Sequence, residues 1–297
     1  MRVFDAFMFN NELDVLELRL AELASVVDRF VLVEAAETHS ARPKPLHFEA
    51  NRHRFQRYLD RIEHVKVECF ANLTDAWARE NSQREAIRLG LQDLADDDFV
   101  IISDVDEIPR PSAIARLRSL PGAAFVGMRL ALFYLRFNYL QLRGADPVFV
   151  WPVAVRGDVL RRLGPQQVRN MRTALHRAHR LGTLAADQVV LDHAGWHFSY
   201  VGDDQSVRDK LASFAHLELA RSEALEQHGI DGILSQRLDL FNRPHFQWVA
   251  VALNEYFPAT LVGAADRYRD LLVSAPEYVI DIAATMAGRV VVLQRAV

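Results

Sequence analysis

The sequence predicts an α/β fold in which a mostly parallel sheet is flanked by helices. Short, largely apolar runs such as residues 3–9 and 99–102 alternate with longer segments whose apolar residues have helical spacing. Continuous apolar strands separated by helices are typical of a parallel sheet that is covered on both faces. Polar and acidic residues follow several of these runs, where ligands bind in open α/β sheets.

The elements can be assigned in order along the chain. In the first half we expect strands at residues 3–9, 30–33, 65–70 and 99–102, and helices at residues 13–23 and 76–94. In the second half we expect strands at residues 125–139 and 148–155, and a short aromatic strand or turn at residues 196–200. Asp203 or Asp204 can cap a helix that runs to about Leu219.

One large domain with an appendage is the simplest organisation. The chain has no internal repeat, low-complexity tract or Gly/Ser-rich linker. We therefore expect one domain over residues 1–245 and a helical carboxyl-terminal tail, residues 246–297, packed on it.

Composition excludes several classes of protein. The 35 basic and 39 acidic residues give a net charge of −4, so there is no basic footprint for nucleic acid. The single cysteine, Cys69, excludes an intramolecular disulfide. An acid at position 5 interrupts the apolar start, and no uncharged apolar run is long enough to cross a bilayer. We expect a soluble, cytoplasmic chain without a transmembrane anchor, compatible with peripheral membrane contact.

The strongest local feature is the acidic turn Asp104-Val105-Asp106, which follows a fully apolar strand. Alternate residues of an extended chain point the same way, so we expect both carboxylates to face one ion. Mg²⁺ and Mn²⁺ favour oxygen ligands and often keep substrate phosphates in their shell. The turn therefore predicts a divalent cation that bridges the protein to a nucleotide diphosphate; the alternative is a solvated acidic loop.

Several ordered motifs make the chain resemble glycosyltransferase family 17. The similar segments are residues 7–14, 27–35, 43–46, 79–84, 102–109, 195–200 and 210–216. They span roughly residues 1–245 and are more specific together than the acidic turn is alone. We expect no amino-terminal membrane anchor, whereas the animal members resemble anchored membrane proteins. In this respect the chain resembles a bacterial member of the family.

The resemblance implies a GT-A-like (Rossmann-like) fold and an inverting glycosyltransferase. It implies transfer of a sugar, GlcNAc from UDP-GlcNAc by preference, to a hydroxyl of a glycan or glycolipid acceptor. It also implies a cofactor, Mn²⁺ or Mg²⁺, that neutralises the departing diphosphate. Two other functions stay open: a sugar nucleotidyltransferase of related fold, and a non-catalytic glycan-binding module.

Five residues are candidate contacts to the donor: Asn10, Glu12, Glu34, Arg84 and Asp104. Asn10 and Glu12 follow the first strand, where Asn10 could equally cap a helix. Glu34 ends the second strand and can accept hydrogen bonds from ribose or base, or be a solvated acid. Arg84 can pair with a diphosphate, or with Glu80 one helical turn away.

His197 and Glu107 are the candidate catalytic residues. His197 lies among aromatic residues, and we expect it to complete the metal shell of Asp104 and Asp106; the alternative is a hydrogen-bonded core histidine. His193 and His216 are the other histidine candidates. Glu107 adjoins the acidic turn and is our first candidate for the base, ahead of Asp203 and Asp204. Trp151, Trp196 and Tyr200 can stack on sugar rings or pack in the core.

Overall fold

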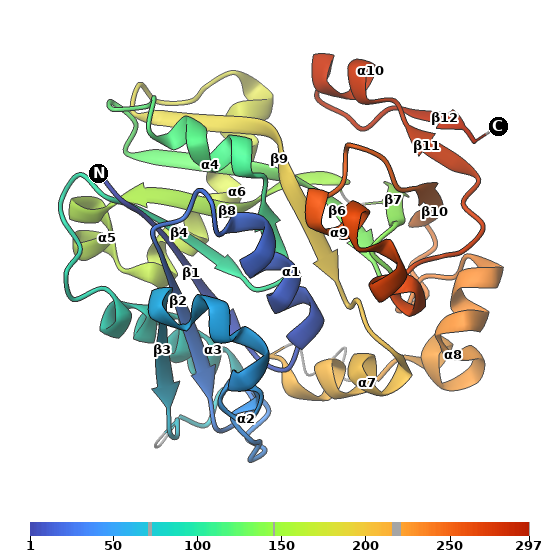
Figure 1. Cartoon of the computed structure of the whole chain (residues 1–297), viewed down its shortest axis with the longest axis horizontal. Helices are drawn as coiled ribbons and strands as arrows, with labels where there is room; N and C mark the ends of the chain where they lie inside the picture. The colour runs from blue at the N-terminus through green and yellow to red at the C-terminus, as the bar shows by residue number, and fades with distance from the viewer. Residues whose placement is uncertain (71–72, 145, 216–220, 297) are drawn as a thin grey trace.

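The computed structural model describes residues 1–70, 73–144, 146–215 and 221–296 (Figure 1). The first part of the chain forms β1 (Val3–Phe9), α1 (Leu13–Leu23), β2 (Arg29–Ala35), α2 (His47–Ala50), η1 (Arg52–Arg61), β3 (Ile62–Val67), α3 (Ala76–Glu85), η2 (Ala86–Gly90), β4 (Phe99–Asp104), β5 (Glu107–Pro109) and α4 (Pro111–Leu117). The second part forms β6 (Phe125–Tyr134), β7 (Tyr139–Arg143), β8 (Val148–Arg156), α5 (Gly157–Leu163), α6 (Pro165–Leu181), β9 (Gln188–Ser199), α7 (Asp204–Ser213) and α8 (Glu223–Gln236). The last part forms β10 (Gln247–Ala252), α9 (Ala259–Gly263), η4 (Ala265–Leu271), β11 (Tyr278–Ile280), α10 (Ile282–Ala287) and β12 (Leu293–Arg295).

The expected α/β fold with a parallel core is confirmed. Strands β3, β2, β1 and β4 lie side by side and are parallel, with helices between them in sequence. Beyond β4 the sheet continues with β8, β6, β7 and β10, and the pairings of β4 with β8, β8 with β6, β6 with β7 and β7 with β10 are antiparallel. The carboxyl ends of β1, β2 and β4 therefore meet at one edge, near α2 and α7 (Figure 1).

Alternation along the central strands builds an apolar core on each face of the sheet. In β4, Phe99 and Ile101 join the core that α1 and α4 cover, whereas Val100 and Ile102 join the core under η2, α5 and α6. Period-2 alternation sends successive side chains to opposite faces, so a strand that is apolar at every position is buried on both sides.

A buried arginine, Arg19, links α1 to the acidic turn. The Arg19 guanidinium is fully buried and forms an ion pair with Asp5 of β1, with an Nη2–Oδ1 distance of 2.5 Å. It also donates to the carbonyl oxygens of Asp104, Val105 and Glu107 at 2.8–3.1 Å. A buried charge is tolerated only when it is paired and hydrogen-bonded, and here the arginine satisfies the turn backbone as well.

The carboxyl-terminal tail differs from the helical appendage that we expected. Residues 246–297 contain strands as well as short helices, and β10 pairs with β7 as part of the main sheet. The sequence analysis also missed α5, α6 and α8, and it gave β9 only its last residues. In β9, the strand extends upstream to Gln188, and Val189, Val190 and Leu191 pair with β6.

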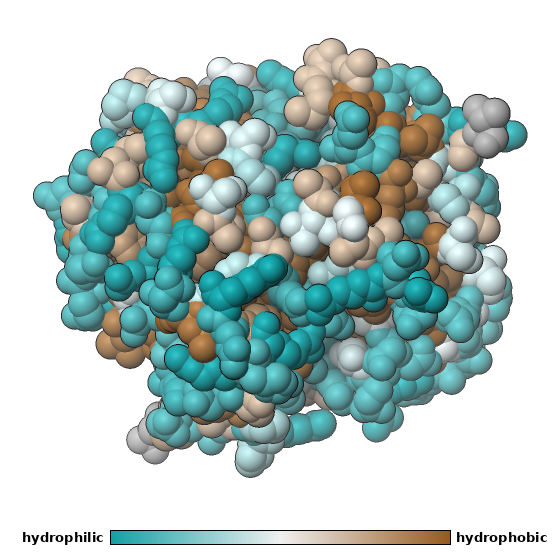
Figure 2. Space-filling model, viewed as in Figure 1, coloured by the Kyte–Doolittle hydropathy of each residue, from teal (hydrophilic) through white to brown (hydrophobic). Residues whose placement is uncertain are grey.

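Hydrophilic residues cover most of the face in Figure 2, and apolar residues gather toward the carboxyl-terminal strands. Among the described residues, no helix has the length and apolar character needed to cross a membrane.

We predict that Arg19→Gln lowers the free energy of unfolding by about 3–5 kcal/mol, because Asp5 is left as a buried, unpaired charge. Urea unfolding followed by circular dichroism measures the change. Arg29→Gln is the matched control, since Arg29 is 42% exposed and its ion pair with Asp93 is long, at 4.0 Å. Equal stability losses in the two variants would contradict the structural role of Arg19.

Candidate active site

A cavity of about 770 Å³ opens at the carboxyl ends of β1 and β4, within the usual size range of small-molecule sites. Both halves of the chain line it. The first half contributes polar residues and one tryptophan from β1, α3 and the segment after β2: Asn10, Glu12, Glu37, Thr38, His39, Lys44, Trp77, Glu80 and Gln83. The second half contributes aromatic and basic residues, among them Tyr134, Phe149, Trp151, Arg169, Arg172, His176, His197, Tyr200, Lys210 and Trp248.

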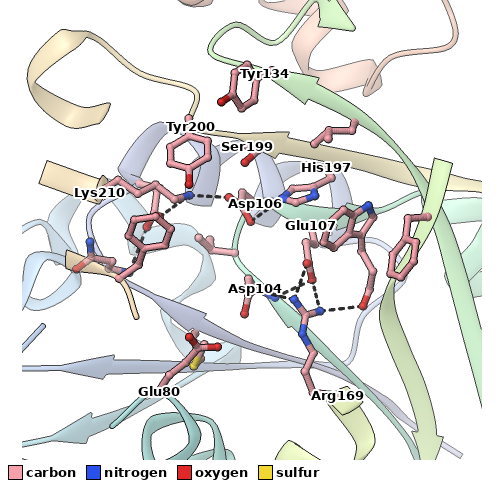
Figure 3. A pocket seen from close by; sticks show the side chains of 18 of the residues that line it. Glu80, Asp104, Asp106, Glu107, Tyr134, Arg169, His197, Ser199, Tyr200 and Lys210 are labelled. Atoms are coloured by element: carbon pink, nitrogen blue, oxygen red, sulfur yellow. Dashed lines mark hydrogen bonds and ion pairs between the residues drawn. The ribbon is translucent and has the colours of Figure 1, made fainter. Parts of the chain in front are cut away.

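The acidic turn lies on the cavity wall, but its two aspartates face different partners (Figure 3). Asp104 accepts from Arg169 at 2.8 Å and from Arg84 at 3.2 Å. Asp106 accepts from the Lys210 ammonium at 2.6 Å. The expectation that both carboxylates face one ion is not met, because β4 ends at Asp104 and the chain turns before Asp106.

Asp104 is held as a charged, half-exposed group. Burial alone would raise the pKa of its carboxyl, but the guanidinium groups of Arg169 and Arg84 outweigh burial and hold that pKa well below its usual range. Its side chain is 34% exposed, so it can still accept hydrogen bonds from a ligand in the cavity. Asp104 is therefore suited to bind ligand hydroxyl groups.

Asp106 lies between Lys210 and His197 (Figure 3). Its second oxygen, Oδ1, is 3.6 Å from Nε2 of His197, which is longer than a hydrogen bond. Lys210 is 3.1 Å from Glu12 as well, so one ammonium group joins the turn after β1, the acidic turn and α7. Burial alone would raise the pKa of the Glu12 carboxyl, but Lys210 reverses this effect and lowers the pKa.

Strand pairing places His197 next to Asp106. Glu107 of β5 is opposite His197 of β9, and the Phe198 N–H donates to the Asp106 carbonyl at 2.8 Å. Gly195 permits this close pairing, because its φ is +155° and a Cβ there would be 2.1 Å from the Ile108 oxygen. Burial lowers the pKa of His197 below 6.5, although Asp106 opposes the shift, so the imidazole is neutral at pH 7.

Asp106 and His197 fit a divalent cation that is completed by substrate. Among the described residues there is no group of three or more His, Cys, Asp or Glu side chains suited to hold a metal ion. The protein offers one carboxylate oxygen and one neutral imidazole nitrogen, which face each other across 3.6 Å. Mg²⁺ and similar ions are often bound by one or two protein groups together with phosphates and water.

Glu107 has a structural position. Both of its oxygens accept from Arg169 at 2.6 Å, one of them also accepts from the Asp104 N–H, and the residue is 1% exposed. A general base needs a free lone pair within reach of the acceptor hydroxyl. The geometry therefore argues against Glu107 as the base and assigns it to the orientation of Arg169.

Two of the predicted donor contacts are also structural. Glu34 is fully buried, does not line the cavity, and accepts from the Phe48 N–H at 3.1 Å and from His64 at 3.1 Å. Arg84 is 2% exposed and pairs with Glu80 as well as Asp104. Its role is to hold Asp104, since Arg84 itself does not line the cavity.

Asn10 and Glu12 line the cavity as expected. Glu12 accepts from the backbone N–H groups of Asn10 and Asn11 at 3.2 and 3.0 Å, so it orders the turn after β1. Of the aromatic candidates, Trp151 and Tyr200 line the cavity, whereas Trp196 is 1% exposed and belongs to the core.

Three of the remaining candidates, Asp203, Asp204 and His193, do not line the cavity. Asp203 caps α7 by accepting from the Ser206 N–H at 2.8 Å, and Asp204 accepts from the Ile230 N–H at 3.0 Å. His193 interacts with the Gly288 carbonyl. His216 lies outside the residues that the structure describes.

Sequence reasoning missed Lys44, Lys210 and Arg169 as cavity residues. A usable signal existed for the lysines, since the chain has three lysines among 35 basic residues and two of the three line the cavity. Arg169 was missed together with its helix, α6. The side chains of α6 that line the cavity recur at helical spacing: Arg169, Arg172, Thr173, His176 and Arg180.

We predict that His197 makes the protein less stable as the pH falls below 6.5. The pKa of His197 is lower in the folded protein than in the unfolded chain, so the unfolded chain binds the proton first and stability falls with pH. The slope from one such group is at most about 1.4 kcal/mol per pH unit. Above pH 6.5 both states are neutral, and His197 adds no pH dependence.

Urea unfolding at pH 7.5, 6.5 and 5.5, in wild type and in His197→Gln, isolates this contribution as a difference. The comparison is needed because burial also lowers the pKa of His39, His176 and His193. Parallel pH profiles in the two proteins would refute the prediction.

Comparison with known proteins agrees with the motifs in the sequence. The family model "Glycosyltransferase family 17" matches residues 1–144. The beta-1,4-mannosyl-glycoprotein 4-beta-N-acetylglucosaminyltransferase of Homo sapiens is 28% identical over 230 residues, which cover 71% of this chain and 43% of the human protein. The Rattus norvegicus protein of the same name is 27% identical and is covered to 42%. The chain thus matches less than half the length of these relatives.

Solved structures of glycosyltransferases align at low similarity. The mannosyltransferase PcManGT from Pyrobaculum calidifontis, in complex with GDP-Man and Mn²⁺, has a TM-score of 0.38 at 15% identity, over 64% of this chain and 56% of that one. Glucosyl-3-phosphoglycerate synthase of M. tuberculosis has a TM-score of 0.38 at 14% identity, over 88% and 92% of the two chains. The family match over residues 1–144 and the curated relatives confirm the resemblance of this chain to glycosyltransferase family 17.

Proposed function

We propose that the protein is a glycosyltransferase that transfers a sugar from a nucleotide-sugar donor to a glycan or glycolipid hydroxyl. The observation that carries the proposal is the juxtaposition of Asp106, His197 and Lys210 on the wall of one cavity, at the carboxyl ends of parallel strands. An oxygen ligand, a neutral nitrogen ligand and an ammonium group together suit a diphosphate and its cation. The curated relatives carry the name of a glycosyltransferase.

The cavity has a natural division between the two substrates. Its first half offers a nucleoside the exposed Trp77 ring of α3 and the polar side chains of Thr38 and Glu80. This half lies beyond the ends of β1 and β2, where nucleotides bind in open α/β sheets. The second half offers aromatic rings, which suit sugars. The donor therefore occupies the first half, and the acceptor enters from the second.

The chain's own residues prepare the site for charge that develops on the leaving diphosphate. Asp106 and His197 would hold the cation, which supplies Lewis-acid stabilisation of that charge when bound. Lys210 lies beside Asp106, where its ammonium group can bind a phosphate oxygen directly. Asp104, fixed by two arginines, accepts hydroxyl groups of the donor. Donors and charges that are fixed before the reaction need little reorganisation during it.

We further propose that the donor is UDP-GlcNAc and that the cation is Mn²⁺ or Mg²⁺. The transfer would invert the configuration at the anomeric carbon. The name of the human relative supports N-acetylglucosamine as the sugar. The cation would occupy the site between Asp106 and His197 described above.

We predict that Asp106→Asn weakens the binding of UDP in Mn²⁺ by at least about tenfold and abolishes sugar transfer, because the carboxylate is the main protein ligand. Isothermal titration of UDP with and without Mn²⁺ measures the binding. Asp97→Asn is the control, since Asp97 is 62% exposed and outside the cavity. Wild-type binding that does not depend on the metal would refute the cation site, and no UDP binding at all would favour a glycan-binding module.

We predict that a UDP sugar, and UDP-GlcNAc above others, raises the melting temperature most in a thermal-shift screen with Mn²⁺. A ligand that binds only the folded state stabilises it in proportion to its affinity. GDP-mannose and a CMP sugar serve as comparison ligands. A larger rise in melting temperature with either of them would contradict a UDP sugar as the donor. Turnover of UTP with a sugar phosphate would indicate a nucleotidyltransferase.

A further inference from the structure

Arg172 differs from the other cations of the cavity wall. Within the described part of the chain, each of the other lysines and arginines that line the cavity lies within 4 Å of an acidic oxygen: Lys44 with Glu34, Arg169 with Asp104 and Glu107, Arg180 with Asp146, Lys210 with Glu12 and Asp106, and Arg243 with Asp239. In this part of the chain the Arg172 guanidinium has no acidic oxygen within 4 Å. It lies over the Trp151 ring, 5.7 Å from the ring centroid.

The surroundings of Arg172 favour a negatively charged ligand. The side chain is half-buried on α6, one turn after Arg169. Burial and the positive charge of Arg169 lower the pKa of the Arg172 guanidinium, although the negative charges of Glu107 and Asp104 oppose the shift. A desolvated cation beside another cation is costly unless an anion approaches it, and guanidinium binds carboxylate or phosphate with two parallel hydrogen bonds.

His197 and Trp151 connect Arg172 to the proposed diphosphate site. From Asp106 the contacts run to His197 at 3.6 Å, from the His197 ring to the Trp151 ring at 4.3 Å, and from Trp151 to Arg172 at 5.7 Å. Arg169, the neighbour of Arg172 on α6, and Lys210 lie on opposite sides of the acidic turn (Figure 3). Arg172 belongs to the second half of the cavity wall, where the proposed function places the acceptor.

Aromatic rings beside Arg172 form a surface suited to a sugar. Phe149 and Trp151 are alternate residues of β8, so they share one face; both line the cavity, half-buried, with ring centroids 5.2 Å apart. The His176 ring is 4.3 Å from Phe149, and its Nε2 is held 2.9 Å from Asp146. Stacking surfaces with polar groups at their edge are what a pyranose ring requires.

We propose that β8 and α6 form an acceptor subsite for a sugar that bears a carboxylate or phosphate group, and that Arg172 binds this group. The subsite consists of Phe149, Trp151, Arg172 and His176. It rests on the proposed function, because it supplies the acceptor for a donor bound at Asp106 and His197. Arg172 thereby determines the acceptor class, anionic over neutral.

The test uses the full-length protein saturated with UDP and Mg²⁺, and three probes: methyl β-D-glucuronide, glucose 6-phosphate and methyl β-D-glucoside. Saturation-transfer NMR titrations give the dissociation constant of each probe. We expect the wild type to bind a charged probe at least about tenfold more tightly than the neutral glucoside. The charged probe that gains more identifies carboxylate or phosphate as the natural group.

Arg172→Gln should remove this preference and leave UDP affinity unchanged. Arg177→Gln is the matched control, because Arg177 is on the same helix, is exposed and does not line the cavity; it should keep the preference. Equal affinity of the wild type for charged and neutral probes overturns the subsite, as does an Arg172→Gln variant that keeps the preference for a charged probe. Failure of the wild type to bind UDP would contradict the proposed function itself. This outcome is distinguishable from loss of the acceptor preference alone.

Discussion

The buried pair of Arg19 and Asp5 is the interaction on which the site depends. The acidic turn has to leave β4 abruptly for its two aspartates to face different partners, and such a turn exposes carbonyl groups inside a core where water cannot reach them. Arg19 supplies donors to three of these carbonyls at once, while Asp5 balances its charge from the strand next to β4. A neutral side chain at position 19 could not satisfy this number of acceptors. The same contact fixes α1 against β1, so the geometry of the acidic turn and the packing of α1 depend on the same side chain.

The central strands and the position of the site could be predicted from the sequence, because both follow from local patterns. Apolar runs predicted β1, β2 and β4, and the acidic pair at the end of β4 predicted where the cavity lies. The assignment of partners could not be predicted in this way. Arg169 is 62 residues from Glu107, and Lys210 is 104 residues from Asp106. No local period relates residues at such distances. Glu34 and Arg84 look equally suited to a ligand in the sequence, and only the fold shows that other protein groups already occupy them.

The charges of the cavity wall form an ordered set. Arginines fix Asp104 and Glu107 on one side of the turn, and a single lysine joins Glu12 and Asp106 on the other. The difference is chemically reasonable. Planar guanidinium groups lock carboxylates in a bidentate manner, whereas an ammonium group on a flexible stem can exchange a carboxylate for a phosphate without rebuilding its surroundings. The arginine-bound carboxylates thus maintain the shape of the wall, whereas the lysine is the group at which a ligand phosphate can replace a protein carboxylate.

The pairing of β5 with β9 has a consequence for how the protein assembles. The two strands bring residue 107 opposite residue 197, with Gly195 at the point of closest approach. The stretch that carries the family match ends at residue 144, so it contains the acidic turn and neither His197 nor Lys210. Contacts of such high sequence separation require closure of the intervening chain, which has an entropic cost. The cavity is therefore a product of the completed tertiary structure, and a nascent chain that had folded only its parallel strands would hold its carboxylates without the groups that give them a function.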